Sequence, residues 1–336
     1  MRVWINHLKY LKRCIFKLPK ECKRYLNNRR EFSAEVAKQL FIHAFREKPY
    51  SDQYITVMDS YVKKLLIQQT QEYIVKSKER HTSEEFEPIV WTCWWQGKEQ
   101  MPAIVKACTA RMKEVFRKAG IKCVIISKDN LQEFIELPEY ILQKFTQKKI
   151  GLAHFADIIR WGLIAQYGGI WLDACDFLCK DDPEVYISYL KRSFYTQKFA
   201  SPDLCPHEPC MGKWCNGYFM GQPHNLVAEY TYAGLLQYWK EQTAPFDYIF
   251  LDYIIRNGYH EIPGFAEIID AVPANSEQFY SFRWKINDVF SEGEYRSVME
   301  KSDFYNISYK LQLNKKNADG KETFYGHIIS KYCDVI

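Results

Sequence analysis

The chain has 336 residues, of which 47% are hydrophobic and 26% charged, so it can bury a sizeable core and is neither disordered nor collagen-like. The formal net charge is +5, but the first 30 residues hold ten basic residues and one acid, Glu21. The other 306 residues carry 36 basic and 40 acidic side chains, a net charge of −4. Because such a body offers no row of positive charges for phosphates, the composition argues against nucleic-acid binding.

Hydropathy and cysteine content indicate the cellular compartment in which the protein resides. No run of about 18 uncharged apolar residues occurs, and charges interrupt the most apolar stretch, residues 155–178, so we expect no membrane-spanning helix. The amino terminus lacks the apolar block that follows the charged start of a secretory signal. The 11 cysteines are an odd number, spread from Cys14 to Cys333, and we expect them to be mostly reduced thiols of a cytoplasmic protein.

Residues 1–30 show the period of a basic amphipathic helix, with basic residues between apolar ones that recur at steps of three and four. The apolar residues are Trp4, Leu8, Leu11, Ile15 and Leu18. Such a helix can lay its apolar stripe into the headgroups of an anionic membrane, or it can pack on the rest of the protein. The one-sided charge favours the first alternative, which predicts peripheral association with the inner face of the membrane.

The remainder of the chain divides into two parts. Residues 31–78 keep a helical period and residues 76–88 are polar, so we expect a helical extension and linker over residues 31–87. Over residues 88–336, short apolar strands alternate with amphipathic helices, which predicts an α/β fold with a parallel sheet and helices on both faces. The expected strands are 88–95, 121–127 and 169–172, and the expected helices are 101–119 and 150–167. Sheets of this kind bind ligands beyond the carboxyl ends of their strands.

Two loops at such strand ends carry candidate functional residues. Trp94-Trp95-Gln96-Gly97 combines aromatic surface with a flexible turn, which suits the stacking of a base, although these residues could equally belong to the core. Gly168 and Gly169 permit a tight turn from helix to strand, and Asp173 emerges where that strand ends. A carboxylate at this place can hold a divalent cation or a ribose hydroxyl.

The expected helix 150–167 contains an acid and a base. Asp157 and Arg160 are three residues apart and therefore lie on one face of a segment that is otherwise largely apolar. Burial of these charges costs several kcal/mol unless they are paired or bound to a ligand. The spacing leaves two interpretations open, a structural salt bridge and a clamp for substrate.

Three segments, in this order, resemble the capsular polysaccharide synthesis glycosyltransferases, relatives of the DXD-containing sugar transferases of glycosyltransferase family 32. They are residues 89–97 (IVWTCWWQG) followed by Met101-Pro102, residues 153–160 (AHFADIIR) and residues 167–174 (YGGIWLDA). A weaker similarity continues through residues 215–223 and 307–310. Three ordered motifs are much more specific than one.

The resemblance implies a GT-A-like fold, with a Rossmann-type mixed sheet, and transfer of a sugar from a nucleotide-sugar donor, foremost a UDP-sugar. It also implies Mn²⁺ or Mg²⁺ as cofactor, retention at the anomeric carbon, and a polysaccharide or lipid-linked precursor as acceptor in capsular or exopolysaccharide synthesis. By position, Asp157, Arg160 and Asp173 would be catalytic, the first two holding the donor sugar and Asp173 serving as the first DXD acid. The implied donor-binding residues further include Trp91, Thr92, Trp94, Trp95, Gly168, Gly169 and Lys310.

The sequence departs from the DXD pattern at its third position, which is Cys175. Asp176 or His327 would then complete the metal site beside Asp173, and Lys310 or His327 could contact the diphosphate. The missing acid also keeps a second hypothesis open, in which the protein is a catalytically inactive family member that serves as a scaffold in a polysaccharide assembly complex.

Overall fold

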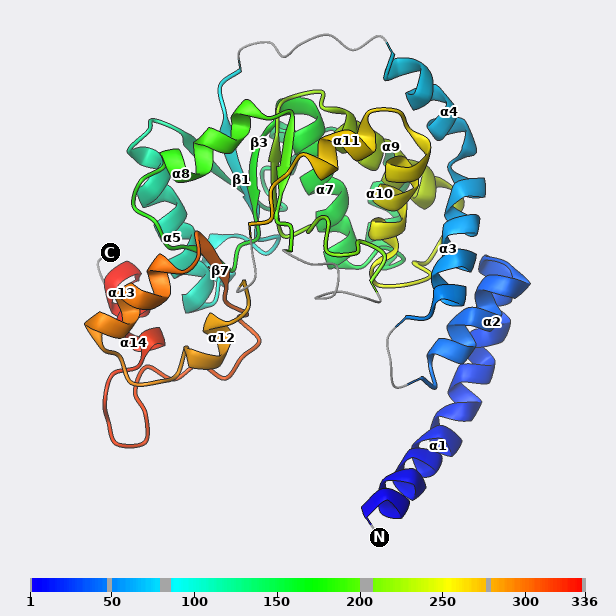
Figure 1. Cartoon of the computed structure of the whole chain (residues 1–336), viewed down its shortest axis with the longest axis horizontal. Helices are drawn as coiled ribbons and strands as arrows, with labels where there is room; N and C mark the ends of the chain where they lie inside the picture. Colours follow the sequence, from blue (N-terminus) through cyan, green and yellow to red (C-terminus); the bar gives the residue numbers. More distant parts are fainter. Residues whose placement is uncertain (1, 47–49, 79–85, 200–207, 276–278, 334–336) are drawn as a thin grey trace.

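The computed structural model describes residues 2–46, 50–78, 86–199, 208–275 and 279–333 (Figure 1). Most of the expected linker, residues 79–85, lies outside the described residues. Within the described part of the chain, no disulfide bond joins two cysteines. None of the helices in this part of the chain is both long and apolar enough to span a membrane.

A five-stranded mixed sheet forms the centre of the protein, in the order β2-β1-β3-β6-β5. The strands are β1 (Ile89–Cys93), β2 (Lys122–Ile126), β3 (Gly169–Leu172), β5 (Phe194–Thr196) and β6 (Tyr218–Gly221). β1 runs parallel to β2 and β3, as expected, whereas β6 is antiparallel to β3 and β5. β4 (Asp176–Leu178) and β7 (Phe304–Asn306) form a separate antiparallel pair.

Both faces of the sheet are buried because apolar residues occupy successive positions of each strand. Trp91, Trp171 and Phe219 are register partners on adjacent strands and belong to one core with helix α7 (Leu152–Tyr167). Their neighbours Val90 and Ile170 face the opposite side, as the two-residue period of a strand requires, and pack in a second core with helix α5 (Ala103–Arg117). The mixed α/β fold with helices on both faces is thereby confirmed.

Most other helices extend these two layers. Figure 1 shows α9 (Leu226–Glu241) and α10 (Phe250–Glu261) on the side of α7, and α8 (Glu184–Ile187) on the side of α5. The short helices are α6 (Glu139–Thr146), α11 (Phe265–Asp270) and the 3-10 turns Lys98–Gln100, Leu131–Glu133 and Ser188–Lys191.

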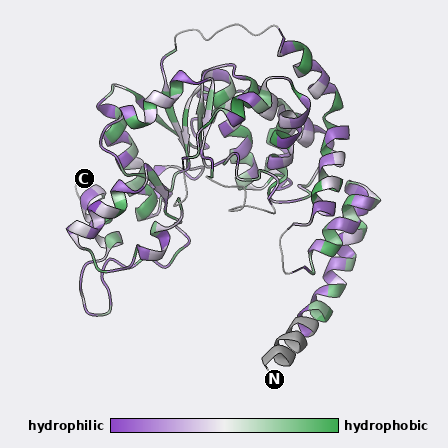
Figure 2. Cartoon of the chain, viewed as in Figure 1, coloured by the Kyte–Doolittle hydropathy of each residue, from purple (hydrophilic) through white to green (hydrophobic). Residues whose placement is uncertain are grey.

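The amino-terminal extension is helical, as expected, and consists of α1 (Arg2–Glu31), α2 (Ala34–His43), α3 (Asp52–Leu65) and α4 (Ile67–Lys76). The hydroxyl groups of Ser33 and Ser51 accept backbone N–H groups and cap α2 and α3. Val36, Met58 and Val62 belong to the same core as α9 and α10, so α2 and α3 are fastened to the body. Figure 2 shows hydrophobic and hydrophilic residues interspersed along α2 to α4 and along the coloured part of α1.

The carboxyl-terminal part packs on α5 around a small core of its own. Its helices are α12 (Phe282–Lys285), α13 (Glu292–Glu300) and α14 (Phe324–Tyr332). Phe282, Tyr305 and Phe324 are buried there together with Ile104 and Cys108 of α5. Since β7 pairs with β4, this part also covers the segment that directly follows Asp173.

Candidate active site

Asp173 lies at the carboxyl end of β3, in a turn that leads directly into β4. Its backbone N–H points to the carbonyl of Gly217 and to the carboxylate of Asp176, both at 3.0 Å, and these contacts fix the turn. Its side chain is 35% exposed. Oδ1 accepts a hydrogen bond from Nε1 of Trp171 at 3.0 Å, whereas Oδ2 has no hydrogen-bond donor among the described residues. One carboxylate oxygen of Asp173 is therefore available to a ligand.

Arg160, on α7, lies between two acids. Its Nε is 3.5 Å from Oδ1 of Asp157, its Nη1 is 3.4 Å from Oδ1 of Asp173, and Nη1 also donates to the carbonyl of Asn216. The guanidinium lies 5.2 Å from the ring centroid of Trp171. The structure thus brings together the three residues that were expected to be catalytic.

Burial and neighbouring charges shift the pKa values of this cluster. Desolvation is the main cause that raises the pKa of Asp157, and the charge of Arg160 opposes it. Burial alone would lower the pKa of Arg160, but the carboxylates of Asp173 and Asp157 outweigh it and raise that pKa, so the guanidinium stays charged. The cluster combines one fixed positive charge with two acids of different exposure.

Asp176 does not face the same space as Asp173, contrary to its expected role as a metal ligand. It is the first residue of β4 and is fully buried. Its two carboxylate oxygens accept from Nδ2 of Asn306 at 2.7 Å and from the backbone N–H of Asp173 at 3.0 Å. Arg283 in turn donates to both the carbonyl and the side-chain oxygen of Asn306. Asp176 therefore holds the turn in place.

His327 is also not brought to Asp173. It lies on α14, where its ring stacks on Phe290 at a centroid distance of 3.8 Å and meets Tyr295 edge-on. Burial is the main cause that lowers its pKa, and its charged neighbours are Glu322, Lys331 and Glu292. Within the described parts of the chain, no three His, Cys, Asp or Glu side chains are grouped as a metal site.

The aromatic residues after β1 have different environments. Trp91 is a core residue, because it is fully buried and its Nε1 donates to the carbonyl of Gly168 at 2.9 Å. It cannot stack on a nucleotide base. Trp95 packs against Phe145 and Phe155. Only Trp94 lies beside the carboxyl-terminal part, where its ring meets that of Tyr309 at a centroid distance of 5.2 Å.

Gly168 and Gly169 serve the fold. Their φ angles are 65° and 97°, which side chains rarely adopt, and a Cβ at Gly169 would collide with the backbone carbonyl of Ile89 on β1. A Cβ at Gly168 would collide with the backbone of Pro223. Both glycines allow the end of α7 to approach the strands closely, and neither is a surface for a donor.

Lys310 lies in the loop after β7, which borders the site, and Cys175 contacts the backbone of this loop at Tyr309. Nζ of Lys310 is exposed and lies 5.8 Å from the ring of Tyr309. Burial raises the pKa of the Cys175 thiol to about 12, although its hydrogen bond with the backbone of Tyr309 opposes this. Cys175 is consequently a neutral thiol and a poor substitute for a carboxylate ligand.

Three residues of the site escaped sequence reasoning. The carboxylate of Asp252 on α10 accepts from Nε1 of Trp214 at 2.9 Å and from Nδ2 of Asn216 at 2.8 Å, and burial raises its pKa to about 7. Tyr280 lies close enough to Asp173 and Asp176 for both charges to raise its pKa, after the effect of burial. Asn216 falls in the segment 215–223 of weaker resemblance, which was the only available signal.

Several buried polar atoms around this site have no hydrogen-bond partner among the described residues. They are Oγ1 of Thr92, Nε1 of Trp94, Nε of Arg160 and Oδ1 of Asn216. Thr92 and Trp94 belong to the end of β1, and Asn216 precedes β6 and contacts Arg160. Because buried polar groups are normally paired, such a group of atoms at the carboxyl edge of a sheet is typical of a ligand site.

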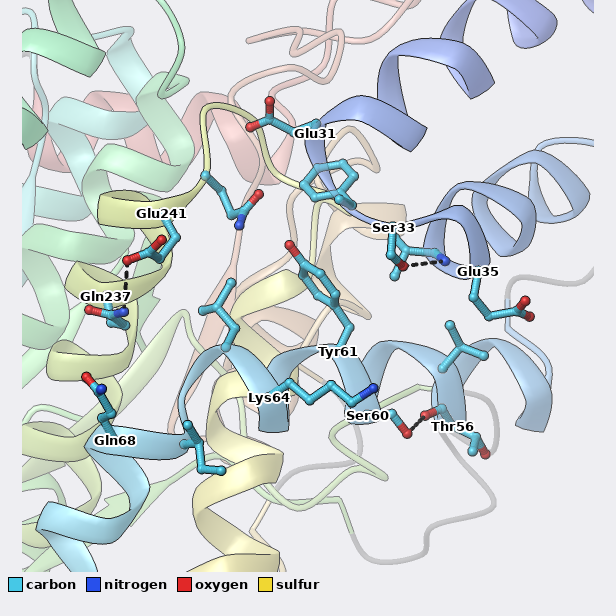
Figure 3. A pocket seen from close by; sticks show the side chains of 16 residues that line it. Glu31, Ser33, Glu35, Thr56, Ser60, Tyr61, Lys64, Gln68, Gln237 and Glu241 are labelled. Carbon is cyan, nitrogen blue, oxygen red and sulfur yellow. Dashed lines mark hydrogen bonds between the residues drawn. The ribbon is translucent and has the colours of Figure 1, made fainter.

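A separate hollow of about 800 Å³ lies between the amino-terminal extension and α9 (Figure 3). Figure 3 shows Glu31, Tyr61, Lys64 and Glu241 around it, and it includes none of the expected site residues. The pKa of Tyr61 is raised, first by burial and then by the charges of Glu31 and Glu241.

Comparison with known proteins gives one family match. The sequence model of a family described as capsular polysaccharide synthesis protein matches residues 38–328. No curated protein matches the chain. Among solved structures, the chain is similar to a protein titled PaToxG Glycosyltransferase, with 14% identity over 83% of this chain and 98% of that one. The TM-score of that comparison is 0.36.

Proposed function

The chain belongs to the capsular polysaccharide synthesis protein family, and from this membership we propose that it is a glycosyltransferase in the synthesis of a capsular or exported polysaccharide. The donor is a nucleotide sugar, foremost a UDP-sugar, and the acceptor is a glycan or a lipid-linked precursor. Retention at the anomeric carbon and a relation to glycosyltransferase family 32 are parts of the same proposal and rest on sequence resemblance alone.

The observation that carries the proposal is the cluster of Asp157, Arg160 and Asp173 at the carboxyl edge of the sheet. The open Oδ2 of Asp173 and the unpartnered polar atoms of Thr92 and Asn216 supply hydrogen-bonding capacity that the described protein groups do not use. Sugars present hydroxyl groups that both donate and accept, so they suit such a mixed set of atoms. A purely structural ion pair would need neither the opening nor the unpartnered atoms.

The departing nucleoside diphosphate develops negative charge, which the site must stabilise. Arg160 lies between two carboxylates, so much of its charge is already compensated. Lys310, exposed at the side of Trp94 and Tyr309, is a cation that can reach toward the diphosphate. We propose that Arg160 orients the donor sugar and that Lys310 contacts the phosphates.

The residues present fit a divalent cation, but with one protein ligand. Oδ2 of Asp173 is open, Asp176 is occupied by hydrogen bonds, and the thiol of Cys175 is neutral. Mn²⁺ or Mg²⁺ at such sites takes one or two carboxylates and completes its shell with water and substrate phosphate oxygens. A bound cation would supply positive charge beside the leaving group. We therefore propose that Asp173 holds the cation and that the nucleotide supplies further ligands.

A panel of nucleotide sugars tests the proposal against the scaffold hypothesis, which Cys175 keeps open. The purified protein is incubated with each donor and a glycan acceptor, and released nucleotide is measured. We expect release from one donor or a few, loss of release in Asp173→Asn, and normal release in Asp288→Asn, an exposed acid of the carboxyl-terminal part. Release from no donor, with or without acceptor, would favour the scaffold.

A further inference from the structure

The carboxyl-terminal part exposes a large aromatic side chain that the fold does not use. Trp284 on α12 is 81% exposed, and among the large hydrophobic side chains whose exposure is described only Phe16 on α1, at 85%, is more exposed. Its neighbour Phe282 is buried in the core. The short helix is thus anchored by Phe282 and presents Trp284 to the surroundings, a typical feature of an interaction surface.

A basic loop is held at the end of the helix that carries this tryptophan. Asn287, one helical turn beyond Trp284, donates from Nδ2 to the carbonyl of Gln312 at 2.8 Å and accepts from the backbone N–H of Asn314 at 2.9 Å. These bonds hold the loop of residues 308–322 against the end of α12. The loop carries four lysines and two acids, all exposed: Lys310, Lys315, Lys316, Lys321, Asp319 and Glu322.

The loop and the amino-terminal helix project in the same direction from the body. Figure 1 shows the free end of α1 and the loop between β7 and α14 on one side of the molecule, at opposite flanks. The carboxyl ends of β1 and β3, and hence the turn with Asp173, face that side as well. On α1, the side chains of Ile15, Phe16 and Leu18 are exposed.

We propose that Trp284 and two lysines of the loop, Lys316 and Lys321, form a second contact with an anionic membrane, at a distance from the contact expected of α1. Tryptophan is enriched at membrane interfaces, and lysines near an anionic leaflet are attracted to its surface. The two contacts hold the catalytic edge of the sheet toward the bilayer, where a lipid-linked acceptor would be presented. This inference rests on the proposed transferase with a lipid-linked acceptor and on the membrane contact expected of α1, and it adds a defined surface.

Vesicle binding of the full-length protein tests the second contact. The variants are Trp284→Ala and the double variant Lys316→Glu/Lys321→Glu, and the probe is vesicles of phosphatidylcholine with about 30% phosphatidylglycerol. We expect each variant to bind about tenfold more weakly than the wild type in co-sedimentation. Hydrogen exchange should show vesicle-dependent protection of residues 308–322. A matched control is Arg117→Glu/Lys122→Glu, which makes the same change in charge at the opposite edge of the sheet, where α5 ends and β2 begins.

The outcomes separate this inference from the proposed function. If neither Trp284→Ala nor Lys316→Glu/Lys321→Glu weakens binding to anionic vesicles, the second contact is overturned and α1 is left as the anchor. Protection of the loop by a soluble acidic polysaccharide, but not by vesicles, overturns it in favour of a glycan partner. Equal weakening by the control variant would show a general charge effect and overturn it too. We expect Trp284→Ala and Lys316→Glu/Lys321→Glu to release nucleotide at the wild-type rate with a soluble acceptor. The failure of the second contact can therefore be distinguished from the absence of transferase activity.

Discussion

Arg160 has two carboxylate partners, Asp157 and Asp173, so the loss of one of them should reduce stability only moderately. In Asp157→Asn the guanidinium keeps its contacts with Asp173 and with the carbonyl of Asn216. Removal of the only partner of a buried charge costs about 3–5 kcal/mol, but Arg160 would not lose its only partner, so we expect a much smaller loss of stability. If Asp157 positions the donor sugar, transfer should fall below detection. Calorimetry beside a turnover assay measures both, and a drop of many degrees with retained turnover would support a purely structural pair.

The open oxygen of Asp173 predicts how the metal dependence responds to substitution. A cation with one protein carboxylate should bind weakly alone and more tightly with nucleotide, because the diphosphate supplies oxygen ligands. Asp173→Asn should therefore lose most turnover, and Cys175→Ser should keep most of it, since a hard cation gains little from a thiol. Donor turnover is measured against Mn²⁺ concentration after chelator treatment. Full turnover in excess chelator would exclude a metal-dependent reaction, and full turnover in Asp173→Asn would place the active site elsewhere.

Asp252 predicts a pH dependence of stability. Its folded-state pKa is raised from 3.8 to about 7, chiefly by burial, so between these values the folded state binds more protons than the unfolded one. Its contribution to stability is thus fully present below pH 4 and falls as the pH rises to 7, by up to about 4 kcal/mol. Asp252→Asn keeps both acceptor bonds and removes this dependence. Urea unfolding at several pH values measures this. The free energy of unfolding of the variant should increase relative to that of the wild type as the pH rises. If the difference between the two proteins does not change with pH, the raised pKa of Asp252 is contradicted.

At the scale of secondary-structure elements, the apolar runs of β1 and β3 and the apolar surface of α7 were sufficient to predict these elements, because local pattern and final environment agree. The resemblance implied that Trp91 lines the nucleotide site, whereas this residue is fully buried in the core and donates to the carbonyl of Gly168. Contacts between distant segments were not visible in the local pattern. Asp176 meets Asn306, 130 residues away, and Asn216 meets Asp252, 36 residues away. The antiparallel strands β5 and β6 were not predicted, because strands of three or four residues carry little periodic signal. The equally short β3 was predicted because two glycines mark its start and the long apolar helix α7 leads into it.

The junction between α7 and β3 predicts a large difference between two glycine substitutions. Gly169→Ala places a Cβ against the carbonyl of Ile89 at a φ of 97°, so we expect a loss of about 2–5 kcal/mol in the free energy of unfolding. Gly120→Ala is the control, because its φ is also positive, at 70°, but no heavy atom lies within 4 Å of the new Cβ. It should cost about 1 kcal/mol. Denaturant unfolding measures both, and equal losses would contradict a packing role for Gly169.

At the scale of the whole molecule, the two halves of helix α1 have different surroundings. Its carboxyl-terminal half packs on α2, where Tyr25 meets Phe41 at a centroid distance of 5.8 Å, and Glu31 accepts a hydrogen bond from Thr243 at 2.7 Å. Before the buried Glu21, the side chains of Ile15, Phe16 and Leu18 are exposed. The part that can contact a membrane therefore ends near residue 20, and the rest of the helix is part of the extension.

Deletion of residues 1–20 should accordingly release the protein from anionic vesicles and leave its folding and its turnover of a soluble acceptor unchanged. The deleted segment carries six lysines and arginines and no acid, so binding before deletion should weaken as salt rises, with screening over about 8 Å at physiological ionic strength. Co-sedimentation with anionic and neutral vesicles at several salt concentrations measures this. Equal binding to both kinds of vesicle would contradict an electrostatic anchor, and a lowered melting temperature after deletion would show that the segment packs on the body instead.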